Sequence, residues 1–447
     1  MHQHCALGLR GGLYLLPALL ISAPNHVSAA TRYSSLTSGT NHSCVLIDEV
    51  DLRHVACWGH NSRGQLGNQS GDPNHDYSQA LPEAVAGLAG YPTQLSAGDA
   101  FTCALLISGS VQCWGDNFQG ALGRYDWFIS NPWPTAHSTS QPLSIGNFGA
   151  GHRAVQISAG GAHACALDTE GSVYCWGDNR NFELGTTNQG LGNWGFLPTP
   201  QQIALPYKAT AITSGTDFSC ALLTGPTLPQ WNIQLPEVRC WGNDSHAELG
   251  DGSAVGGNKV TPVLVQGLKL FPTAISAGTQ GACALDDLGD EQCWGDGLDG
   301  EIGSGKSYQA TNGLSLTADA VVGGPYNVLM TGGDRDNFNC SALSSHGGLA
   351  CWGNNYWNQL TSRCQSGSTC NSPIMATLFA ANVIWPDSAP ATPTEISGGI
   401  GHTCAIATLL GAPHVYCWGH NDYGQVGNGD TSYSYWFSIV PDPELIL

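Results

Sequence analysis

The residues of this chain with the clearest chemistry are its cysteines, because most of them recur in pairs. Seven cysteines begin the triplet Cys-Trp-Gly, and each has another cysteine 10 to 20 residues before it. Zinc sites use cysteines two to four residues apart, a spacing that is missing from the sequence. A gap of about ten residues across a turn instead suits two facing strands, so we expect a disulfide in each pair. The pairs are Cys44 with Cys57, Cys103 with Cys113, Cys165 with Cys175, Cys220 with Cys240, Cys283 with Cys293, Cys340 with Cys351, and Cys404 with Cys417.

The remaining cysteines fit the same interpretation. Cys364 and Cys370 lie in one loop and form an eighth expected pair. Cys5 lies in an N-terminal segment that reads as a removable signal. The mature chain is then left with an even number of cysteines, as expected for an oxidising compartment.

One segment formally matches a phosphate-binding loop. Residues Gly300–Ser307 read GEIGSGKS, in the pattern G-x-x-x-x-G-K-S. That motif needs a helix directly after it, whereas the next residues contain Gly313 and no helix-start signal. Ile302 and Gly303 also occupy a Leu-Gly position that recurs along the chain. We therefore predict a structural bend here, with no nucleotide or other cofactor bound.

Histidines and acidic segments raise the question of a metal. His42, His163 and His402 each lie two residues before a cysteine, but other repeats carry phenylalanine there, which indicates a packing position. Asp296–Glu301 and Gly332–Asn337 are acidic, yet neither has the ligand spacing of a calcium loop, so we expect solvated turns. The sequence thus predicts no metal site. It also offers no nucleophile and base set apart from the repeats, so we do not expect an enzyme.

The cysteine pairs belong to a repeat that recurs seven times, at intervals of 53 to 66 residues. A turn signal separates the two cysteines of each pair, and strand-like alternation flanks it, which predicts a β-hairpin. If Cys165 lies opposite Cys175, Leu167 faces Val173, and a small residue lies opposite each tryptophan. An aliphatic residue follows eight positions after each tryptophan: Leu66, Leu122, Leu184, Leu249, Ile302, Leu360 and Val426.

None of the seven sheet units can bury its apolar faces alone, and packing them side by side in a closed ring buries all of them. We predict an all-β, seven-bladed β-propeller of four-stranded antiparallel blades. Within each unit, a strand like TPVLVQGL is expected to precede one like AISAG and then the hairpin. The N- and C-terminal strands are expected to share one blade and so close the ring. The tryptophans expected to fill the space between blades are Trp58, Trp114, Trp176, Trp241, Trp294, Trp352 and Trp418.

The net charge and the N-terminal segment indicate which classes of partner and which compartment to expect. The formal net charge is −20, with 34 acidic and 14 basic side chains, which argues against nucleic acid and anionic membrane surfaces. Residues 1–29 carry Arg10, a short apolar run and a small-residue cleavage site, so they read as a signal peptide. The alternative is a truncated extra repeat, because HCALGLRGGLYLLP loosely copies the repeat pattern. We expect an exported monomer, extracellular or periplasmic, whose propeller spans 30–447, without membrane insertion.

The repeat ISAGGAHACALDTEGSVYCWGDNRNFELG resembles that of the regulator of chromosome condensation family, whose fold is a seven-bladed β-propeller. The founding nuclear member is a guanine-nucleotide exchange factor that docks on chromatin. The acidity, the paired cysteines and the expected export depart from that setting, so exchange activity is not implied. The chain is similar in setting to exported bacterial propellers, including a propeller-type β-lactamase inhibitory protein that binds its target through loops on one face. The resemblance implies a bacterial-type, exported member.

Aromatic residues outside the Cys-Trp-Gly triplets suggest a binding surface. Several gather in equivalent segments after the Leu-Gly bend, which should emerge on the face opposite the hairpin turns. They either pack against neighbouring blades or form an exposed interaction patch. The function expected is protein binding, with carbohydrate or cell-wall binding as the alternative. The candidate residues are Trp127, Phe128, Trp133, Trp194, Trp357, Tyr435 and Trp436.

Overall fold

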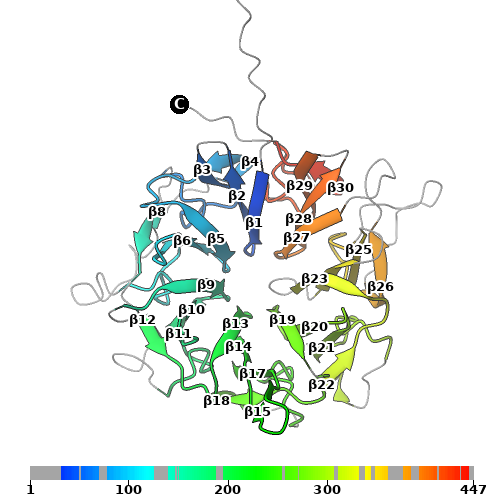
Figure 1. The fold of residues 1–447 in the computed structure, drawn as a ribbon. Coiled ribbons are helices and arrows are strands. Elements are labelled where there is room, and N and C mark those ends of the chain that lie inside the picture. The colour runs from blue at the N-terminus through cyan, green and yellow to red at the C-terminus, as the bar shows by residue number, and fades with distance from the viewer. Residues whose placement is uncertain are drawn as a thin grey trace, which may run out of the picture.

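The computed structural model places seven four-stranded antiparallel sheets around a central axis, as Figure 1 shows. This arrangement confirms the predicted all-β, seven-bladed propeller. The structure describes residues 32–49, 52–69, 78–124, 139–145, 148, 151–187, 195–253, 257–269, 271–306, 311–331, 338–343, 348–360, 376–383, 392–409, 412–432 and 434–441. The predicted signal, residues 1–29, lies outside these ranges. Within them, no helix is long and apolar enough to cross a membrane.

In every blade except the fourth, the four strands are consecutive in the chain and are ordered from the axis outward (Figure 1). The first three blades are β1 (Arg32–Ser38), β2 (His42–Asp48), β3 (Arg53–Gly59) and β4 (Gln79–Ala84); β5 (Pro92–Ala97), β6 (Phe101–Leu106), β7 (Val111–Gly115) and β8 (Thr139–Ser144); and β9 (Ala154–Ala159), β10 (His163–Asp168), β11 (Val173–Asp178) and β12 (Phe196–Gln202).

The fourth blade inserts a small two-stranded ribbon, β15 (Thr227–Leu228) and β16 (Ile233–Gln234), into its central hairpin. The last four blades are β13 (Ala209–Ser214), β14 (Phe218–Leu223), β17 (Glu237–Gly242) and β18 (Lys259–Leu264); β19 (Pro272–Ala277), β20 (Gly281–Asp286), β21 (Glu291–Asp296) and β22 (Leu314–Ala320); β23 (Tyr326–Thr331), β24 (Phe338–Leu343), β25 (Leu349–Asn354) and β26 (Ala376–Val383); and β27 (Thr392–Gly398), β28 (His402–Leu409), β29 (Ala412–Gly419) and β30 (Ser434–Ile439).

The hairpin register is the predicted one. Cys165 lies opposite Cys175, Leu167 opposite Val173, and Ala164 opposite Trp176. All seven hairpin pairs form disulfides, with Cα atoms 4.0–4.1 Å apart. Seven disulfides indicate an oxidising compartment. Cys364 and Cys370 lie outside the described residues.

Two expectations about strand assignment were wrong. The strand Lys259–Leu264, which contains TPVL, pairs with β17 of the fourth blade and is its outermost strand, so it does not begin the fifth. The sequence places this strand beside the following AISAG strand, but the bend after Cys-Trp-Gly turns it back along the blade it has just left. For the same reason β1 and β30 lie in separate sheets, and the terminal strands do not share a blade.

The first and last blades instead lie side by side, as Figure 1 shows. Hydrogen bonds join their innermost strands, β1 and β27. The Glu395 carboxylate of β27 accepts from the backbone N–H groups of Ser35 (2.9 Å) and Leu36 (2.6 Å) in β1. The hydroxyl of Ser397 accepts from the N–H of Ser38 at 2.8 Å. Comparable side-chain acceptors, such as Gln94 for the N–H of Ile157, link other neighbouring blades. The ring is therefore closed by side-chain hydrogen bonds and by a backbone hydrogen bond from the N–H of Ile400 to the carbonyl of Thr40 (3.0 Å), rather than by a shared sheet.

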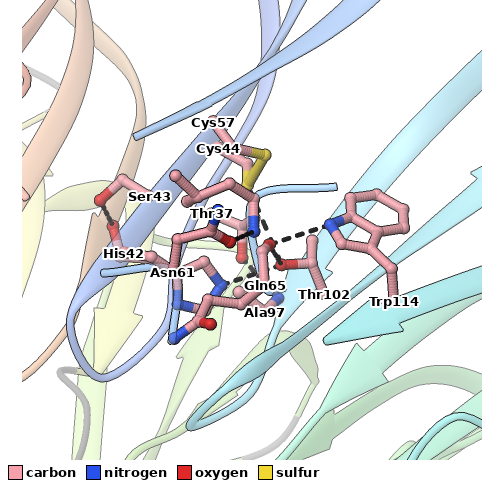
Figure 2. Close-up of a disulfide and its surroundings, with 12 residues drawn as sticks. Thr37, His42, Ser43, Cys44, Cys57, Asn61, Gln65, Ala97, Thr102 and Trp114 are labelled. Carbon is pink, nitrogen blue, oxygen red and sulfur yellow. Dashed lines mark hydrogen bonds between the residues drawn. A yellow bond between two sulfur atoms is a disulfide. The ribbon is translucent and has the colours of Figure 1, made fainter. Parts of the chain in front are cut away.

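The core lies between the blades, and the seven predicted tryptophans fill it. All seven are at most 1% exposed. Each indole N–H donates to a backbone carbonyl in the preceding blade; Trp114 donates to Gln65 at 2.9 Å, as Figure 2 shows. Thr102, the small residue opposite Trp114, donates to the same carbonyl at 3.2 Å. The residue opposite the tryptophan also donates to the carbonyl that its tryptophan binds in three other blades, through Ser219, Asn339 and Thr403.

Candidate binding face

One end of the propeller gathers the loops that are best fixed for binding. We call it the bend face. It consists of the axial loops, which join the first and second strands of a blade, and the bends that follow Cys-Trp-Gly. Both lie at one end because His42 at the start of β2 pairs with Gly59 at the end of β3. The hairpin turns lie at the opposite end, which we call the hairpin face.

Side chains within each bend hold its shape. In the first blade the Asn61 carboxamide oxygen accepts from the N–H of Leu66 at 3.1 Å, and Gln65 accepts from Arg63 at 2.8 Å. Gly67 has φ +66°, and a Cβ there would lie 2.7 Å from the Trp114 indole nitrogen of the next blade. The invariant spacing from tryptophan to Leu-Gly thus fits one blade's bend against the next blade's tryptophan.

The axial loops are joined to one another by backbone hydrogen bonds around the axis. The N–H of Asp99 donates to Gly161 at 3.0 Å, the N–H of Gly161 to Thr216 at 3.1 Å, and the N–H of Thr216 to Gly278 at 3.2 Å. They surround an axial cavity of about 220 Å³ lined mainly by serine, threonine, alanine and glycine. Loops tied to one another in this way present a fixed surface.

A cleft of about 180 Å³ opens on the bend face between the second and third blades. Phe118 lines it and is 52% exposed. Arg180 binds the buried Asp178 carboxylate, with its Nε 3.0 Å from both oxygens, and this hydrogen bonding raises the pKa of Arg180. The acidic residues that line the cleft are Asp99, Asp116, Asp178 and Asp217. The cleft therefore combines an apolar side chain with an excess of negative charge.

The predicted aromatic residues are only partly described. Trp357 is half-buried and stacks on His420 of the next blade, with ring centroids 4.5 Å apart. Its contact with Gly401 further favours a packing role. Tyr435 and Trp436 lie in β30, but their side chains fall outside the described residues, and so do the residues Trp127, Phe128, Trp133 and Trp194. Their binding role stays a prediction.

The ends of these aromatic segments do lie on the predicted face. Thr139, which follows the segment containing Trp127, pairs with Gly115 at the bend-face end of β7. Ser434 pairs with Gly419 in the same way at the end of β29. The described flanks therefore lead to the face opposite the hairpin turns. Phe118, which the sequence analysis did not single out, also lies there; its signal was an aromatic residue four positions after a blade tryptophan.

The three histidines are packing residues, as predicted. Their Nε2 atoms contact hydroxyls of the next blade: His42 with Thr102 at 2.9 Å, His163 with Ser219 at 2.8 Å, and His402 with Ser43 at 3.0 Å. Burial lowers the pKa of His42 and His402 to about 3 and the pKa of His163 to about 4, so all three are neutral. Figure 2 shows His42 beside the Cys44–Cys57 disulfide.

The phosphate-loop match forms a blade bend. Ile302 is 2% exposed, and Gly303 has no room for a side chain beside Trp352. Lys306 pairs with Asp319. Residues 307–310 lie outside the described part of the chain, and the described residues between there and strand β22 contain no α-helix of the kind that follows a phosphate loop.

The expectation of a solvated turn at Asp296–Glu301 was wrong for its two end residues. Asp296 is 8% exposed and Glu301 is 6% exposed. Glu301 occupies the position of Gln65, where the side chain turns inward to accept a backbone N–H; its partner is Asp299 at 2.9 Å. Burial raises the pKa of Glu301 well above its usual range, and the charge of Asp296 adds to this effect. The second acidic segment, Gly332–Asn337, lies outside the described residues.

One buried carboxyl was missed by sequence reasoning. Glu291 is 2% exposed and accepts a hydrogen bond from Ser341 of the sixth blade at 2.7 Å. Burial raises the pKa of Glu291 to about 8. It lies beside Cys283 and Cys293, forming the one cluster of three potential metal ligands among the described residues. Those two cysteines are bonded to each other. The available signal was that the other blades carry Val or Leu at this position.

Comparison with known proteins agrees with this architecture. Two models of the Regulator of chromosome condensation (RCC1) repeat match the chain, one over residues 93–121 and 154–183 and the other over 54–105 and 170–222. The mouse E3 ubiquitin-protein ligase HERC2 is 26% identical over 84% of this chain, which spans only 7% of that protein's length. The Arabidopsis thaliana Ultraviolet-B receptor UVR8 is 27% identical over 75% of this chain and 67% of its own.

A solved structure shares the whole ring. Yeast RCC1 (Prp20), crystallised with Kap60, superposes with a TM-score of 0.68 and 19% identity, over 98% of this chain and 92% of that one. An identity this low shows the fold alone. Taken with the seven sheets, it shows that this chain is a seven-bladed β-propeller, and the matched residues show that RCC1-type repeats form part of it.

Proposed function

We propose that this protein is an exported, non-catalytic binding module of the bacterial type, which binds another protein on its bend face. The observation that carries the proposal is the cleft between the second and third blades. It combines the exposed Phe118 ring with four aspartates and a single arginine. Interfaces gain most of their energy from such aromatic anchors, while the surrounding charges select the partner.

The rigidity of the bend face supports protein binding. The disulfides, the side-chain bonds between innermost strands and the backbone bonds between axial loops fix the surface before any partner arrives. A pre-ordered surface loses little conformational entropy on association. Yeast RCC1 (Prp20) was solved bound to Kap60, so a protein that contains this fold is known to bind another protein.

The charge of the molecule defines the partner's chemistry. With a net charge of −20 and an acid-lined cleft, the protein attracts a surface that carries lysine and arginine. Such attraction raises the association rate and is weakened by salt. We therefore expect a basic protein partner whose capture declines as ionic strength increases.

Capture from the native extracellular medium, followed by mass spectrometry, tests the proposal. The double variant Phe118→Ala, Asp116→Asn should lose the partner, whereas Trp231→Ala should keep it. Trp231 is a matched control because it is 65% exposed and belongs to the ribbon inserted in the fourth blade's hairpin, on the hairpin face. Loss of capture with the control alone would move the binding site to the hairpin face. Recovery of a polysaccharide instead would favour carbohydrate binding.

The aromatic residues predicted from the sequence provide a second test. Trp127→Ala and Trp436→Ala should keep the melting temperature and lose the partner. Trp176→Ala is the control, because truncating a buried tryptophan costs about 3–5 kcal/mol of stability. If the first two variants melt as early as the control, those residues pack within the ring and do not bind.

A further inference from the structure

The interface between the fifth and sixth blades contains a small cavity that the rest of the ring fills with a side chain. The cavity measures about 20 Å³, enough for one water molecule or one metal ion. Gly281 lines it at the position where the other blades carry a histidine or phenylalanine, such as His42 and Phe101. The missing ring leaves the space open.

Two buried carboxyl groups line this cavity. Asp296 is the last residue of β21, and Glu301 lies in the bend that follows. In the first blade the equivalent pair is His60 and Gln65, which are joined by a hydrogen bond of 3.3 Å. In the fifth blade neither member can donate once both are ionised, so the two carboxylates repel each other.

The third blade has the same pair of carboxyl groups and shows how it can be neutralised. There Asp178 and Glu183 are accompanied by Arg180, which binds Asp178 directly. The fifth blade has Leu298 at the position of Arg180. His246 lies near Asp296 but is paired with Glu248 of its own blade, 3.4 Å away.

An unsatisfied oxygen lines the same cavity. Thr279 is 9% exposed, and its hydroxyl has no hydrogen-bond partner among the described residues. The sixth blade contributes Asn339, whose amide nitrogen donates to the carbonyl of Glu301 at 2.6 Å. The side chains around the cavity thus offer carboxylate, hydroxyl and amide oxygens and no sulfur. Oxygen donors of this kind bind hard divalent cations.

We propose that Asp296, Glu301 and Thr279 bind a calcium ion at this interface. Calcium takes about six to eight oxygen ligands in irregular geometry, so water entering from the open side of the cavity can complete the set that these side chains begin, whereas magnesium demands a nearly ideal octahedron. The ion replaces the charge that Arg180 supplies in the third blade. It also ties the axial loop of the fifth blade to its bend beside the sixth.

Terbium luminescence tests the site directly, because Trp294 lines the cavity and can sensitise a bound lanthanide. The full disulfide-bonded protein should give a saturable signal that calcium displaces. Asp296→Asn and Glu301→Gln should weaken binding by at least about tenfold, because each removes one charged ligand. Glu183→Gln in the third blade is the matched control and should leave the signal unchanged.

Folding of the variants is checked by melting. Glu301→Gln should fold, because glutamine occupies this position in three other blades, for example as Gln359. Calcium should raise the melting temperature of the native protein and not that of Glu301→Gln. Gly281→Phe keeps both carboxylates and fills the cavity, so it should also abolish the signal. A terbium signal that persists in Asp296→Asn and Glu301→Gln, or no calcium effect in the native protein, would overturn the proposal.

Discussion

Replacing Glu291 by valine should change how the stability of the ring depends on pH. Glu291 is fully buried, with a pKa of about 8 in the folded protein against about 4.5 in the unfolded chain. Between these values the folded protein holds a proton that the unfolded chain releases. The stability from this group is therefore fully present below pH 4.5 and is lost as the pH rises through 8. The loss between pH 5 and pH 8 is about 4 kcal/mol.

The assay is calorimetric melting of native and variant protein at several pH values, with the disulfides intact. Glu291→Val paired with Ser341→Ala restores the aliphatic and small residues found between other blades, as in Val55 and Ala104. Glu291→Gln keeps the acceptor for Ser341 and removes the titration. Between pH 5 and pH 8, the unfolding free energy of both variants should rise by about 4 kcal/mol relative to that of the native protein. If native and variant curves stay parallel over this range, Glu291 does not hold a proton in the folded state and the reasoning fails.

Three further predictions concern the core and the bends. His42, His163 and His402 are neutral when folded, so the stability that they contribute is lost as the pH falls below 6.5. By pH 4 each histidine should lower the unfolding free energy by roughly 3 kcal/mol. Replacing all three with phenylalanine should remove this loss, which melting experiments would measure. Trp176→Ala should lower the unfolding free energy by about 3–5 kcal/mol in the same assay. Titration calorimetry with ATP or GTP and magnesium should show no binding, and a saturable signal that Lys306→Ala abolishes would contradict the bend assignment.

The blade itself could be predicted because its sequence signals are local. Facing strands alternate with a period of two residues, so the cysteine spacing sets the register, and the register sets which residue faces each tryptophan. The contacts between Cys165 and Cys175 and between Ala164 and Trp176 followed from that rule alone. Strand-to-blade assignment did not, because the outermost strand lies between two blades in the sequence. The bend after Cys-Trp-Gly determines which of the two blades this strand pairs with.

The polar groups between blades were harder to predict. Thr102 was expected to be small, and its hydrogen bond to Gln65 depends on where the neighbouring blade places a carbonyl. Glu291 was visible as a departure from Val or Leu, but its partner Ser341 lies 50 residues away in another blade. Buried polar pairs of this kind arise from tertiary contacts. An internal alignment of the repeats would have found the positions, though not the partners.

Side chains that differ from one repeat to another make the stability of the ring depend on pH in two opposite directions. Interfaces that bury His42, His163 or His402 lose stability as the pH falls, because a neutral imidazole must take up a proton without water around it. The interface between the fifth and sixth blades loses stability as the pH rises, because Glu291 must release one. Well below pH 4.5 only the histidines change the slope of stability with pH, and well above pH 6.5 only the carboxyl does. Between these values the three histidines outweigh the single carboxyl, so these groups alone place the most stable condition at about pH 7, where every one of these side chains is still uncharged in the folded ring.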